Sequence, residues 1–452
     1  MEAQHHSATA GTEGGIVTGT VTICPACDLI LATKPLFIPY GSSLVCPRCR
    51  KCIRTAKRNT VTRTLALSLT GLLLYGPAHF MVLLTFDMLG RYESGSVFDS
   101  VTALFNQRYG FVSLAVLLTA QVIPLLKLGL LFLVSLGISL DRPVSPLRAL
   151  LRWYVHLEEW GMTDVYLIGI LVTIVKMKPT TNIAYEPGFY CFVGLVGVMV
   201  ALSMVFDRHR FWERMETLRS RSSEPETSSG GTETVGAGLR PGRVASAAGF
   251  QACHTCNKTM RLGRGAPGER YHCPRCGGLA HGRVTDSVSR TMALVVTALV
   301  LSFPANLLPI MEVELFGAPE KSTIMDGIRY FFRSGTYGIG LIILCASILV
   351  PLFKILGLSV LLYSIRFHRA TRLVQKALMF RFIAFIGRWS MLDIFVIALL
   401  CSLVNFGFLT TVRPAPAAVF FTLVVASTMF AAISFDERLL WDLAEQGSSR
   451  NG

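Results

Sequence analysis

The sequence is poor in charged residues for its length. Only 16% of its 452 residues are charged, whereas soluble globular domains carry roughly 25%. Hydrophobic residues make up 52% of the chain, and its mean hydropathy is +0.52. A chain of this composition is not expected to bury all of its apolar segments in a water-soluble core, so we expect lipid to be its main solvent.

Three further patterns are missing from the sequence. Residues 1–60 are polar and lack the apolar core of a secretory signal, so we expect the N-terminus to stay in the cytoplasm. No Gly-x-x-x-x-Gly-Lys-Ser/Thr motif occurs, which argues against ATP as the chain's own energy source. No nucleophile–base pair or open metal site is visible, so we predict no catalytic residues and no enzyme. A membrane thiol oxidoreductase is the enzymatic alternative, which dithiol activity after loss of metal would support.

The net charge of +15 is concentrated between the apolar segments. Arginines are frequent at 208–221 and 366–388, whereas the loops at 87–110 and 314–336 mix acids with fewer bases. Basic loops stay on the cytoplasmic side of a membrane, so we expect a multi-pass protein with both termini in the cytoplasm. Nucleic-acid binding is the competing interpretation of the charge, but these bases flank apolar segments rather than one soluble face.

The chain contains an internal repeat that covers nearly its whole length. Arg63-Thr64-Leu65-Ala66-Leu67 corresponds to Arg290-Thr291-Met292-Ala293-Leu294, with an offset of 227 residues. Trp160-x-Met162-x-Asp164 corresponds to Trp389-x-Met391-x-Asp393, with an offset of 229. Agreement at steady offsets indicates two homologous halves that differ by a two-residue insertion.

Each half combines a cysteine-rich segment with four apolar runs, several of them near the ~20 residues needed to span a bilayer. We predict an α-helical polytopic membrane protein with two parallel repeats of four transmembrane helices, each preceded by a small β-type zinc ribbon. The spans are expected near 64–86, 111–138, 162–178, 188–206, 291–313, 337–365, 390–408 and 415–435. Residues 145–160 and 369–388 are expected to form interfacial helices. The predicted domains are a disordered N-terminus (1–19), ribbon 1 (20–60), transmembrane domain 1 (61–217), a flexible linker (218–249), ribbon 2 (250–286), transmembrane domain 2 (287–443) and a tail (444–452).

Eight of the twelve cysteines occur as CxxC pairs with the spacing of zinc ribbons. The predicted ligands are Cys24, Cys27, Cys46 and Cys49 in the first half, and Cys253, Cys256, Cys273 and Cys276 in the second. Four cysteine ligands leave no open position, so we expect two structural Zn²⁺ ions. A redox dithiol is the alternative, but it requires a βαβ context that is absent. A histidine ligand among His254, His272 and His281 is the other alternative.

Ionisable side chains inside the apolar runs are candidates for function, because each costs roughly 2.5–3.5 kcal/mol on insertion. Lys127 and Lys354 each follow a proline in a long apolar run, and Asp164 and Asp393 begin the third run of each half. A lysine and an aspartate from neighbouring spans could neutralise each other. The alternative is that these pairs only hold helices together. Lys176 is expected to anchor at the interface.

The motifs of the second half resemble the paraquat-inducible protein A family. They are Phe303-Pro304-Ala305-Asn306-Leu307-Leu308-Pro309-Ile310, Ser322-Thr323-Ile324-Met325 and Val350-Pro351-Leu352-Phe353-Lys354-Ile355. The resemblance covers about residues 20–443. The first half matches more loosely, with Pro77-Ala78-His79 in place of the Pro-Ala-Asn triplet.

The resemblance implies an inner-membrane protein that works with a periplasmic tunnel of stacked MCE domains and moves phospholipids between two membranes. It also implies a polar cluster of Lys354, Asp393 and Thr428 that couples lipid loading or extraction to an ion gradient. Further transport or coupling candidates are Asn306, Lys127, Asp164 and Lys176. A membrane anchor or scaffold for the tunnel, without transport of its own, is the alternative function.

Overall fold

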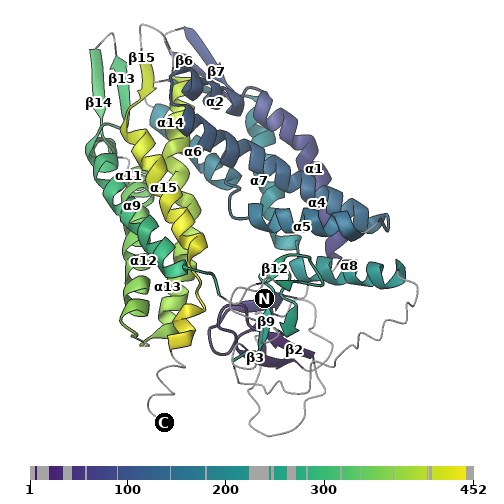
Figure 1. The fold of residues 1–452 in the computed structure, drawn as a ribbon. Coiled ribbons are helices and arrows are strands. Elements are labelled where there is room, and N and C mark those ends of the chain that lie inside the picture. The colour runs from purple at the N-terminus through teal and green to yellow at the C-terminus, as the bar shows by residue number, and fades with distance from the viewer. Residues whose placement is uncertain are drawn as a thin grey trace.

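The computed structural model describes residues 6–7, 20–33, 43–55, 57, 59–88, 90–142, 144–178, 181–222, 244–245, 249–261, 271–280, 283–315, 318–335, 337–369, 371–404, 406 and 410–443. Two helical bundles lie side by side, with the ribbon strands grouped at one end (Figure 1). The predicted tail, nearly all of the predicted N-terminal segment and most of the predicted linker lie outside the described residues.

The elements of the first half begin with short strands and continue with helices. The strands of its ribbon are β1 (His6–Ser7), β2 (Thr20–Ile23), β3 (Ile30–Thr33), β4 (Ser43–Val45) and β5 (Cys52–Thr55). They are followed by α1 (Thr60–Phe80), β6 (Leu84–Met88), β7 (Arg91–Gly95), α2 (Val97–Asn106), α3 (Gly110–Val116), η1 (Leu117–Val122), α4 (Ile123–Ser139), α5 (Val144–Leu157), α6 (Thr163–Met177), β8 (Asn182–Tyr185), α7 (Pro187–Val205) and α8 (Arg208–Ser222).

The second half repeats this order. Its ribbon strands are β9 (Phe250–Ala252), β10 (Thr259–Arg261), β11 (Tyr271–His272) and β12 (Leu279–Ala280). They are followed by α9 (Ser287–Leu307), β13 (Met311–Leu315), β14 (Ala318–Ser322), α10 (Ile324–Arg333), α11 (Tyr337–Ile343), η2 (Leu344–Leu349), α12 (Val350–Arg366), α13 (Leu373–Ile386), η3 (Gly387–Met391), α14 (Leu392–Leu403), β15 (Thr410–Pro414) and α15 (Ala417–Ser434).

The repeat extends to local irregularities of the helices. A π-helical turn, η1 or η2, precedes Pro124 in the first half and Pro351 in the second. Proline has no N–H, and its ring clashes with the carbonyl four residues earlier, so the preceding turn widens. In this chain those carbonyls belong to Ala120 and Ser347, and both lie inside the π turns.

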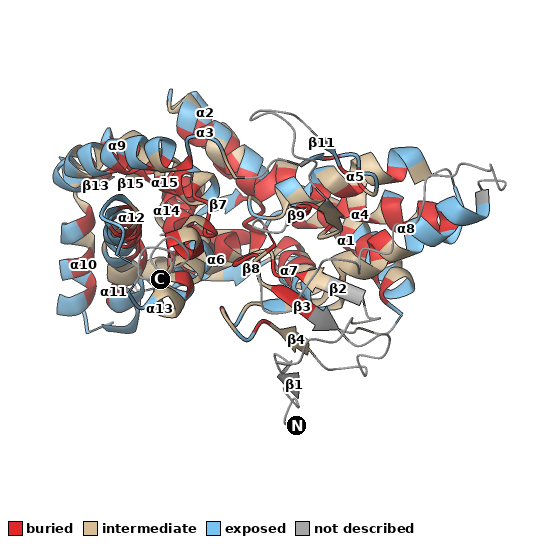
Figure 2. Cartoon of the chain, turned by 60° about the horizontal axis from the view of Figure 1, so that its bottom comes forward, coloured by how far each residue is buried: buried red, intermediate tan, exposed pale blue. Residues whose placement is uncertain are grey.

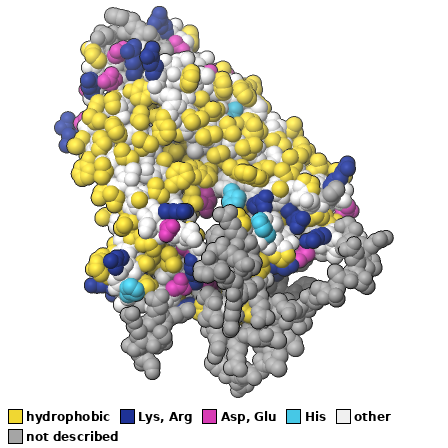
Figure 3. Space-filling model, viewed as in Figure 1, with side chains coloured by type: hydrophobic (Ala, Val, Ile, Leu, Met, Phe, Trp, Pro, Cys, Tyr) yellow, Lys and Arg dark blue, Asp and Glu magenta, His cyan; other side chains and the backbone are white. Residues whose placement is uncertain are grey.

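Six of the described helical segments are long and apolar enough to cross a membrane. They are Gly110–Ser139, Pro187–Val205, Ser287–Leu307, Gly340–Arg366, Leu373–Leu403 and Ala417–Ser434. α1 and α6 occupy the other two predicted span positions, and α6 has only 15 residues. Most of the segment 369–388 forms α13, which continues through η3 into α14 as one 31-residue apolar helical segment. On the face of the bundles that Figure 3 shows, the side chains are largely hydrophobic.

Each half carries a three-stranded antiparallel sheet at the end opposite the ribbons, in the orders β7-β6-β8 and β14-β13-β15 (Figure 1). Both sheets lie at the same end, so the two halves run in the same direction, as expected for parallel repeats. Only loops were expected there from the sequence. The hairpins β6–β7 and β13–β14 are local, whereas the residues of β8 and β15 follow those they pair with by about 100 positions, so no local pattern indicates the pairing of these two strands.

The core is deepest around α14, between the two bundles (Figure 2). α14 packs against α6 and α2 of the first half. Gly169 permits this approach, because a Cβ at that position would lie 3.2 Å from the Cβ of Phe395. The rings of Tyr166 and Phe395 also meet across the same contact, with centroids 5.2 Å apart. The side chain of Asp393 is therefore placed in the first turn of the most enclosed helix.

Candidate functional site

Each ribbon gathers four buried cysteine sulfurs that fit one metal ion. The sulfurs of each set lie within 4.8 Å of one another. Measured Sγ–Sγ distances are 3.5 Å for Cys24–Cys49 and 3.6 Å for Cys27–Cys46. In the second set, Cys253–Cys276 and Cys256–Cys273 are both separated by 3.5 Å. A tetrahedral ion with metal–sulfur bonds of about 2.3 Å requires sulfurs about 3.8 Å apart. The donor sets therefore fit two structural ions.

The backbone of the four CxxC turns is the same. In each turn, the residue after the second cysteine has a left-handed backbone conformation. Its φ is 54° at Asp28, 57° at Arg50, 54° at Asn257 and 68° at Gly277. Its N–H donates to the carbonyl of the first cysteine, at 3.0 Å for Asp28 and 2.8 Å for Gly277. The turn thus brings both sulfurs of a pair to one side.

Two of the three histidines near the second ribbon have other contacts. His254 Nε2 lies 3.0 Å from a guanidinium nitrogen of Arg438, and His272 Nδ1 lies 3.3 Å from the carbonyl of Gly277. His281 lies outside the described residues. The cysteine-only ligand sets therefore agree with the ligands chosen from the sequence.

The metal-binding turns dock on the opposite half of the chain. In ribbon 1, the carbonyl of Cys49 accepts a hydrogen bond from Arg381 of α13 at 2.8 Å, and Lys51 pairs with Glu437 at 2.8 Å. In ribbon 2, the carbonyl of Gly277 accepts from Arg152 of α5 at 3.1 Å. Arg152 and Arg381 are equivalent in the repeat, so the exchange is symmetrical. Each ribbon therefore ties the two bundles together.

A charged network closes the junction between the ribbons and the end of α15. Arg283 bonds to Asp28 of ribbon 1 and, at 2.6 Å, to Asp442. Arg438 donates to Asp436 at 2.9 Å. Burial alone would raise the pKa of Asp436, but the hydrogen bonds and charge of Arg438 lower it below its usual value. This network fixes ribbon 1 to the second bundle.

The second bundle encloses a group of polar side chains around η3. Lys354 and Ser390 are almost completely buried, and their terminal atoms have no hydrogen-bond partner among the described residues, whereas the hydroxyl of Ser347, also buried, lies beside the carboxylate of Asp393. One carboxylate oxygen of Asp393 is also buried and has no hydrogen-bond partner among the described residues. Thr428 of α15 is also buried, but its hydroxyl donates to the carbonyl of Val425 at 2.9 Å. Buried polar atoms usually have partners, so this group is suited to hold an ion, water or a polar headgroup.

The structure does not pair Lys354 with Asp393, which corrects one expectation. Lys354 approaches η3, where a Cβ at Gly387 would lie 3.9 Å from its ammonium nitrogen. The Asp393 carboxylate instead lies beside Ser347 and interacts with the charge of Lys176. Ser347, which lies beside the Asp393 carboxylate, precedes Lys354 by seven residues, or roughly 10 Å along a helix. The charges of Lys354 and Asp393 therefore lie at different depths along the helix axis.

Lys176 belongs to the first half but faces the second. Its ammonium nitrogen lies 3.8 Å from the sulfur of Met311 in β13, and the lysine interacts electrostatically with Asp393. Lys176 was expected to be an interface anchor, and its acidic partner was left open. The structure instead places Lys176 on the side of the polar group that faces the other bundle, an arrangement that no local pattern in the sequence indicates.

The corresponding positions of the first half are not equivalent. Ala120 and Gly161 stand where the second half has Ser347 and Ser390. Lys127 donates to the carbonyl of Glu158 at 3.4 Å and is partly exposed, whereas Lys354 is fully buried; Asp164 and Asp393 are both partly exposed. Lys127 and Asp164 form no ion pair within 4.0 Å in the part of the chain that the structure describes. The polar group of the first half therefore lacks the two serines and the fully buried lysine of the second.

The π turn of the first half is also held in place by α1. His79 contacts the carbonyl of Ala120 at 3.3 Å, the carbonyl that Pro124 displaces, and Tyr75 donates to the carbonyl of Gln121 at 2.9 Å. The equivalent of His79 is Asn306, which is exposed and donates within its own helix to Ser302 at 2.8 Å. The first π turn is thus bound to its neighbour, whereas Asn306 does not reach the second.

Ser347 and Ser390 are part of the site, although neither was chosen as a site residue from the sequence. A serine in an apolar helix is usually satisfied by its own backbone, so the residue type alone gives no signal. The comparison of the two halves carries the signal, because both serines replace a small apolar residue of the repeat.

Comparisons with known proteins cover both halves of the chain. The family model described as paraquat-inducible protein A matches residues 61–216 and 288–445. The chain is 30% identical over 421 residues to "Intermembrane transport protein PqiA" of Escherichia coli (strain K12), covering 93% of this chain and 95% of that protein. It is 31% identical over 427 residues to "Lipophilic envelope-spanning tunnel protein A" of the same strain, covering 94% and 92%. No solved structure matches.

Proposed function

Because the chain belongs to the paraquat-inducible protein A family, we propose that it is a transport subunit that moves phospholipid between the membranes of a bacterial envelope. The names of its relatives, which refer to intermembrane transport and to an envelope-spanning tunnel, support this class of function. The finer proposal is that it loads or extracts phospholipid for a periplasmic MCE-domain tunnel. The sheets β6–β8 and β13–β15 would then face the periplasm.

The orientation of the protein in the membrane follows from the distribution of its basic residues. The ribbon end carries the arginines of α8 and of the junction after α15, and basic segments remain on the cytoplasmic side of the inner membrane. Both termini would then be cytoplasmic. The two cysteine sets would hold Zn²⁺, the ion that prefers four-coordinate thiolate sites in such ribbons.

The observation that carries the proposal is the buried polar group of the second half. Lys354, Ser347, Ser390 and Asp393 offer both a cation and a carboxylate inside an apolar bundle. Such groups are expensive unless they serve an ion or substrate pathway. We propose that Asp393 takes up and releases a proton, with Lys176 as its charged neighbour, and that the proton-motive force drives the lipid step. One charge crossing 100 mV supplies about 2.3 kcal/mol.

The alternative is a scaffold that anchors the tunnel without transport of its own. The exchanged ribbon docking favours it, because that arrangement is suited to a rigid platform. The two functions differ in what they require. A scaffold needs the sheets and ribbons but tolerates changes of the buried polar group, whereas a transporter needs that group.

Replacing Asp393 by asparagine tests the proposal directly. The substitution keeps shape but removes the charge, so we expect lipid transfer between membranes to fall at least about ten-fold while the folded protein accumulates normally. Asp164→Asn, at the equivalent position of the first half, is the matched control and should transfer lipid at the wild-type rate. The measurement is transfer of labelled phospholipid in cells or reconstituted membranes. Normal transfer by Asp393→Asn would support the scaffold instead.

A further inference from the structure

The helix α8 leaves the first bundle at the edge of the membrane. It begins three residues after the apolar segment Pro187–Val205 ends, and it runs across the ribbon end of that bundle (Figure 1). Three residues of chain span at most about 10 Å, so α8 begins within or next to the headgroup layer of the bilayer. A charged side of α8 that the rest of the chain leaves open is therefore placed to meet lipid headgroups.

Two sides of α8 are covered by the protein itself. Phe211, Trp212, Met215 and Leu218 are buried, and the helix packs on α5 of the first bundle. The ring of Phe211 lies 5.1 Å from that of Phe206, at the end of α7. This apolar side fixes how α8 is rotated about its axis.

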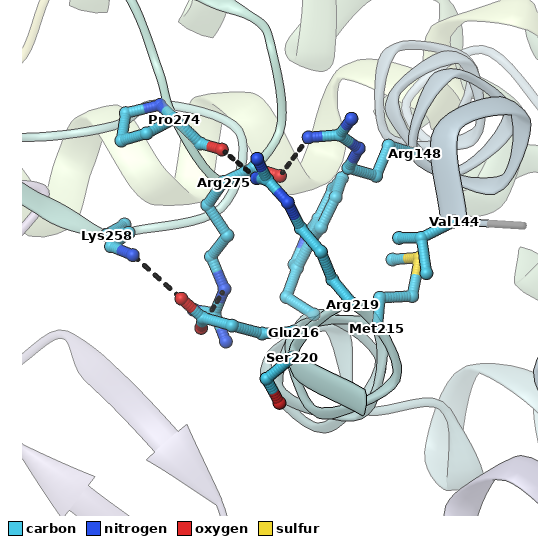
Figure 4. Close-up of a pocket in the computed structure, with 10 residues that line it drawn as sticks. Val144, Arg148, Met215, Glu216, Arg219, Ser220, Lys258, Pro274 and Arg275 are labelled. Atoms are coloured by element: carbon cyan, nitrogen blue, oxygen red, sulfur yellow. Dashed lines mark hydrogen bonds and ion pairs between the residues drawn. The ribbon is translucent and has the colours of Figure 1, made fainter. Parts of the chain in front are cut away.

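The acidic side of α8 is occupied by the two ribbons. Glu213 pairs with Arg54 of ribbon 1 at 2.9 Å. Glu216 points towards ribbon 2, where it pairs with Lys258 at 2.8 Å and with Arg275 at 3.2 Å (Figure 4). These are the two acids of the helix, so both hold ribbons in place.

Three arginines occupy the remaining side of α8. Arg210, Arg214 and Arg221 are spaced i, i+4 and i+11, so they lie within about 40° of one another around the helix axis. The same geometry places them about 110° from the apolar side and about as far from the acidic side. Arg210 lies at the edge of this group, 3.9 Å from Glu213. Arg214 and Arg221 are exposed, and their guanidinium groups have no partner among the described residues.

The open side is the part of α8 whose charge is not compensated within the described chain. The other arginines of the helix have contacts there, because Arg208 pairs with Glu158 at 2.6 Å and Arg219 donates to the carbonyl of Pro274 at 3.2 Å. Like charges one helical turn apart repel each other when nothing neutralises them. An anionic partner outside the described chain would therefore stabilise this side of α8.

We propose that Arg210, Arg214 and Arg221 form a surface that binds the headgroups of anionic phospholipids in the leaflet on the ribbon side. Clustered basic residues directly after a membrane span attract anionic lipid, and arginine stems are long enough to reach the phosphates. The position of α8 next to a span favours lipid over a soluble acidic protein. The bound headgroups hold α8, and with it both ribbons, against the membrane. This role is independent of whether the protein transports lipid.

The test is photo-crosslinking of the purified full-length protein in nanodiscs of dioleoylphosphatidylcholine with about one fifth dioleoylphosphatidylglycerol. A diazirine-bearing amino acid replaces Thr217, which is exposed on the basic side, or in a separate protein Val193, which is exposed on α7 and samples the bulk lipid. Mass spectrometry identifies the attached lipids. We expect the ratio of phosphatidylglycerol to phosphatidylcholine adducts to be at least about five-fold higher at 217 than at 193, the contribution of one arginine near an anionic surface.

The variant Arg214→Gln/Arg221→Gln should bring the ratio at 217 to within about two-fold of that at 193. The matched control is Arg329→Gln/Arg333→Gln, two exposed arginines of α10 at the opposite end of the molecule, which should leave the ratio at 217 unchanged. Salt provides a measurement on the unsubstituted arginines, because raising NaCl from about 0.1 M to about 1 M shortens the Debye length from about 10 Å to about 3 Å and should remove the enrichment.

Three results would overturn the proposal. The first is an equal ratio at positions 217 and 193. The second is an enrichment at 217 that neither the double substitution nor salt reduces. The third is an adduct of residue 217 with the segment 223–243 of the chain itself in place of lipid, since that would identify an internal acidic segment as the partner.

Discussion

Lys354→Met is expected to make the protein more stable and to abolish lipid transfer. The ammonium group is fully buried, and its nitrogen has no hydrogen-bond partner among the described residues. Methionine has a similar length and carries no charge to desolvate, so the substitution should raise the free energy of unfolding by about 1–4 kcal/mol. Thermal unfolding in detergent and transfer of labelled phospholipid, measured on the same preparation, check both parts.

The control for this prediction is Lys127→Met at the equivalent position of the first half. Lys127 is partly exposed and donates to the carbonyl of Glu158. Replacing it should therefore change the free energy of unfolding little. We expect a stability change within about 0.5 kcal/mol and normal transfer. A less stable Lys354→Met protein that still transfers lipid would mean that Lys354 only holds helices together.

Loss of one metal ion is expected to release helices of the other half. Replacing Cys24 and Cys27 by serine leaves two thiolates, which cannot close a four-coordinate site worth about 10–16 kcal/mol in isolated metal-binding peptides. Ribbon 1 should then unfold and lose its contacts with Arg381 and Glu437. Amide hydrogen exchange should accelerate in α13 and at residues 436–443, and not in α5.

The reciprocal variant sharpens this test. Cys253→Ser with Cys256→Ser should accelerate exchange in α5 and α8, because Arg152 and Arg219 lose the carbonyls of Gly277 and Pro274. Faster exchange confined to the bundle that directly follows each ribbon would contradict the exchanged docking. The metal content measured by elemental analysis should fall from two ions to one in each variant.

The sequence predicted those features that are repeated or locally spaced. Two CxxC pairs per half identified both metal sites, and the steady offsets indicated two parallel halves. The helices could also be predicted, because an apolar run of suitable length is a local feature of the sequence. β8 and β15 were missed because their pairing is long-range, and the hairpins β6–β7 and β13–β14 were missed as well, although their pairing is local.

The charges of the buried group were identified from the sequence, but their neighbours were not. Asp393 and Lys354 are costly wherever they lie in a membrane, so residue type alone marks them. Their partners depend on how the bundles pack. The electrostatic interaction of Lys176 with Asp393 crosses between halves, and Lys354 approaches Gly387 of η3 rather than Asp393. Neither is encoded in a local spacing.

The central claim is that the second half, and not the first, receives the transported lipid, and crosslinking in living cells tests it most directly. A diazirine analogue of leucine is placed at Ile355, beside Lys354, and in a separate protein at Leu128, its buried equivalent in the first half. After illumination, mass spectrometry detects any attached phospholipid. We predict an adduct at residue 355 and none at 128. No adduct at 355, or equal adducts at both positions, would contradict the account.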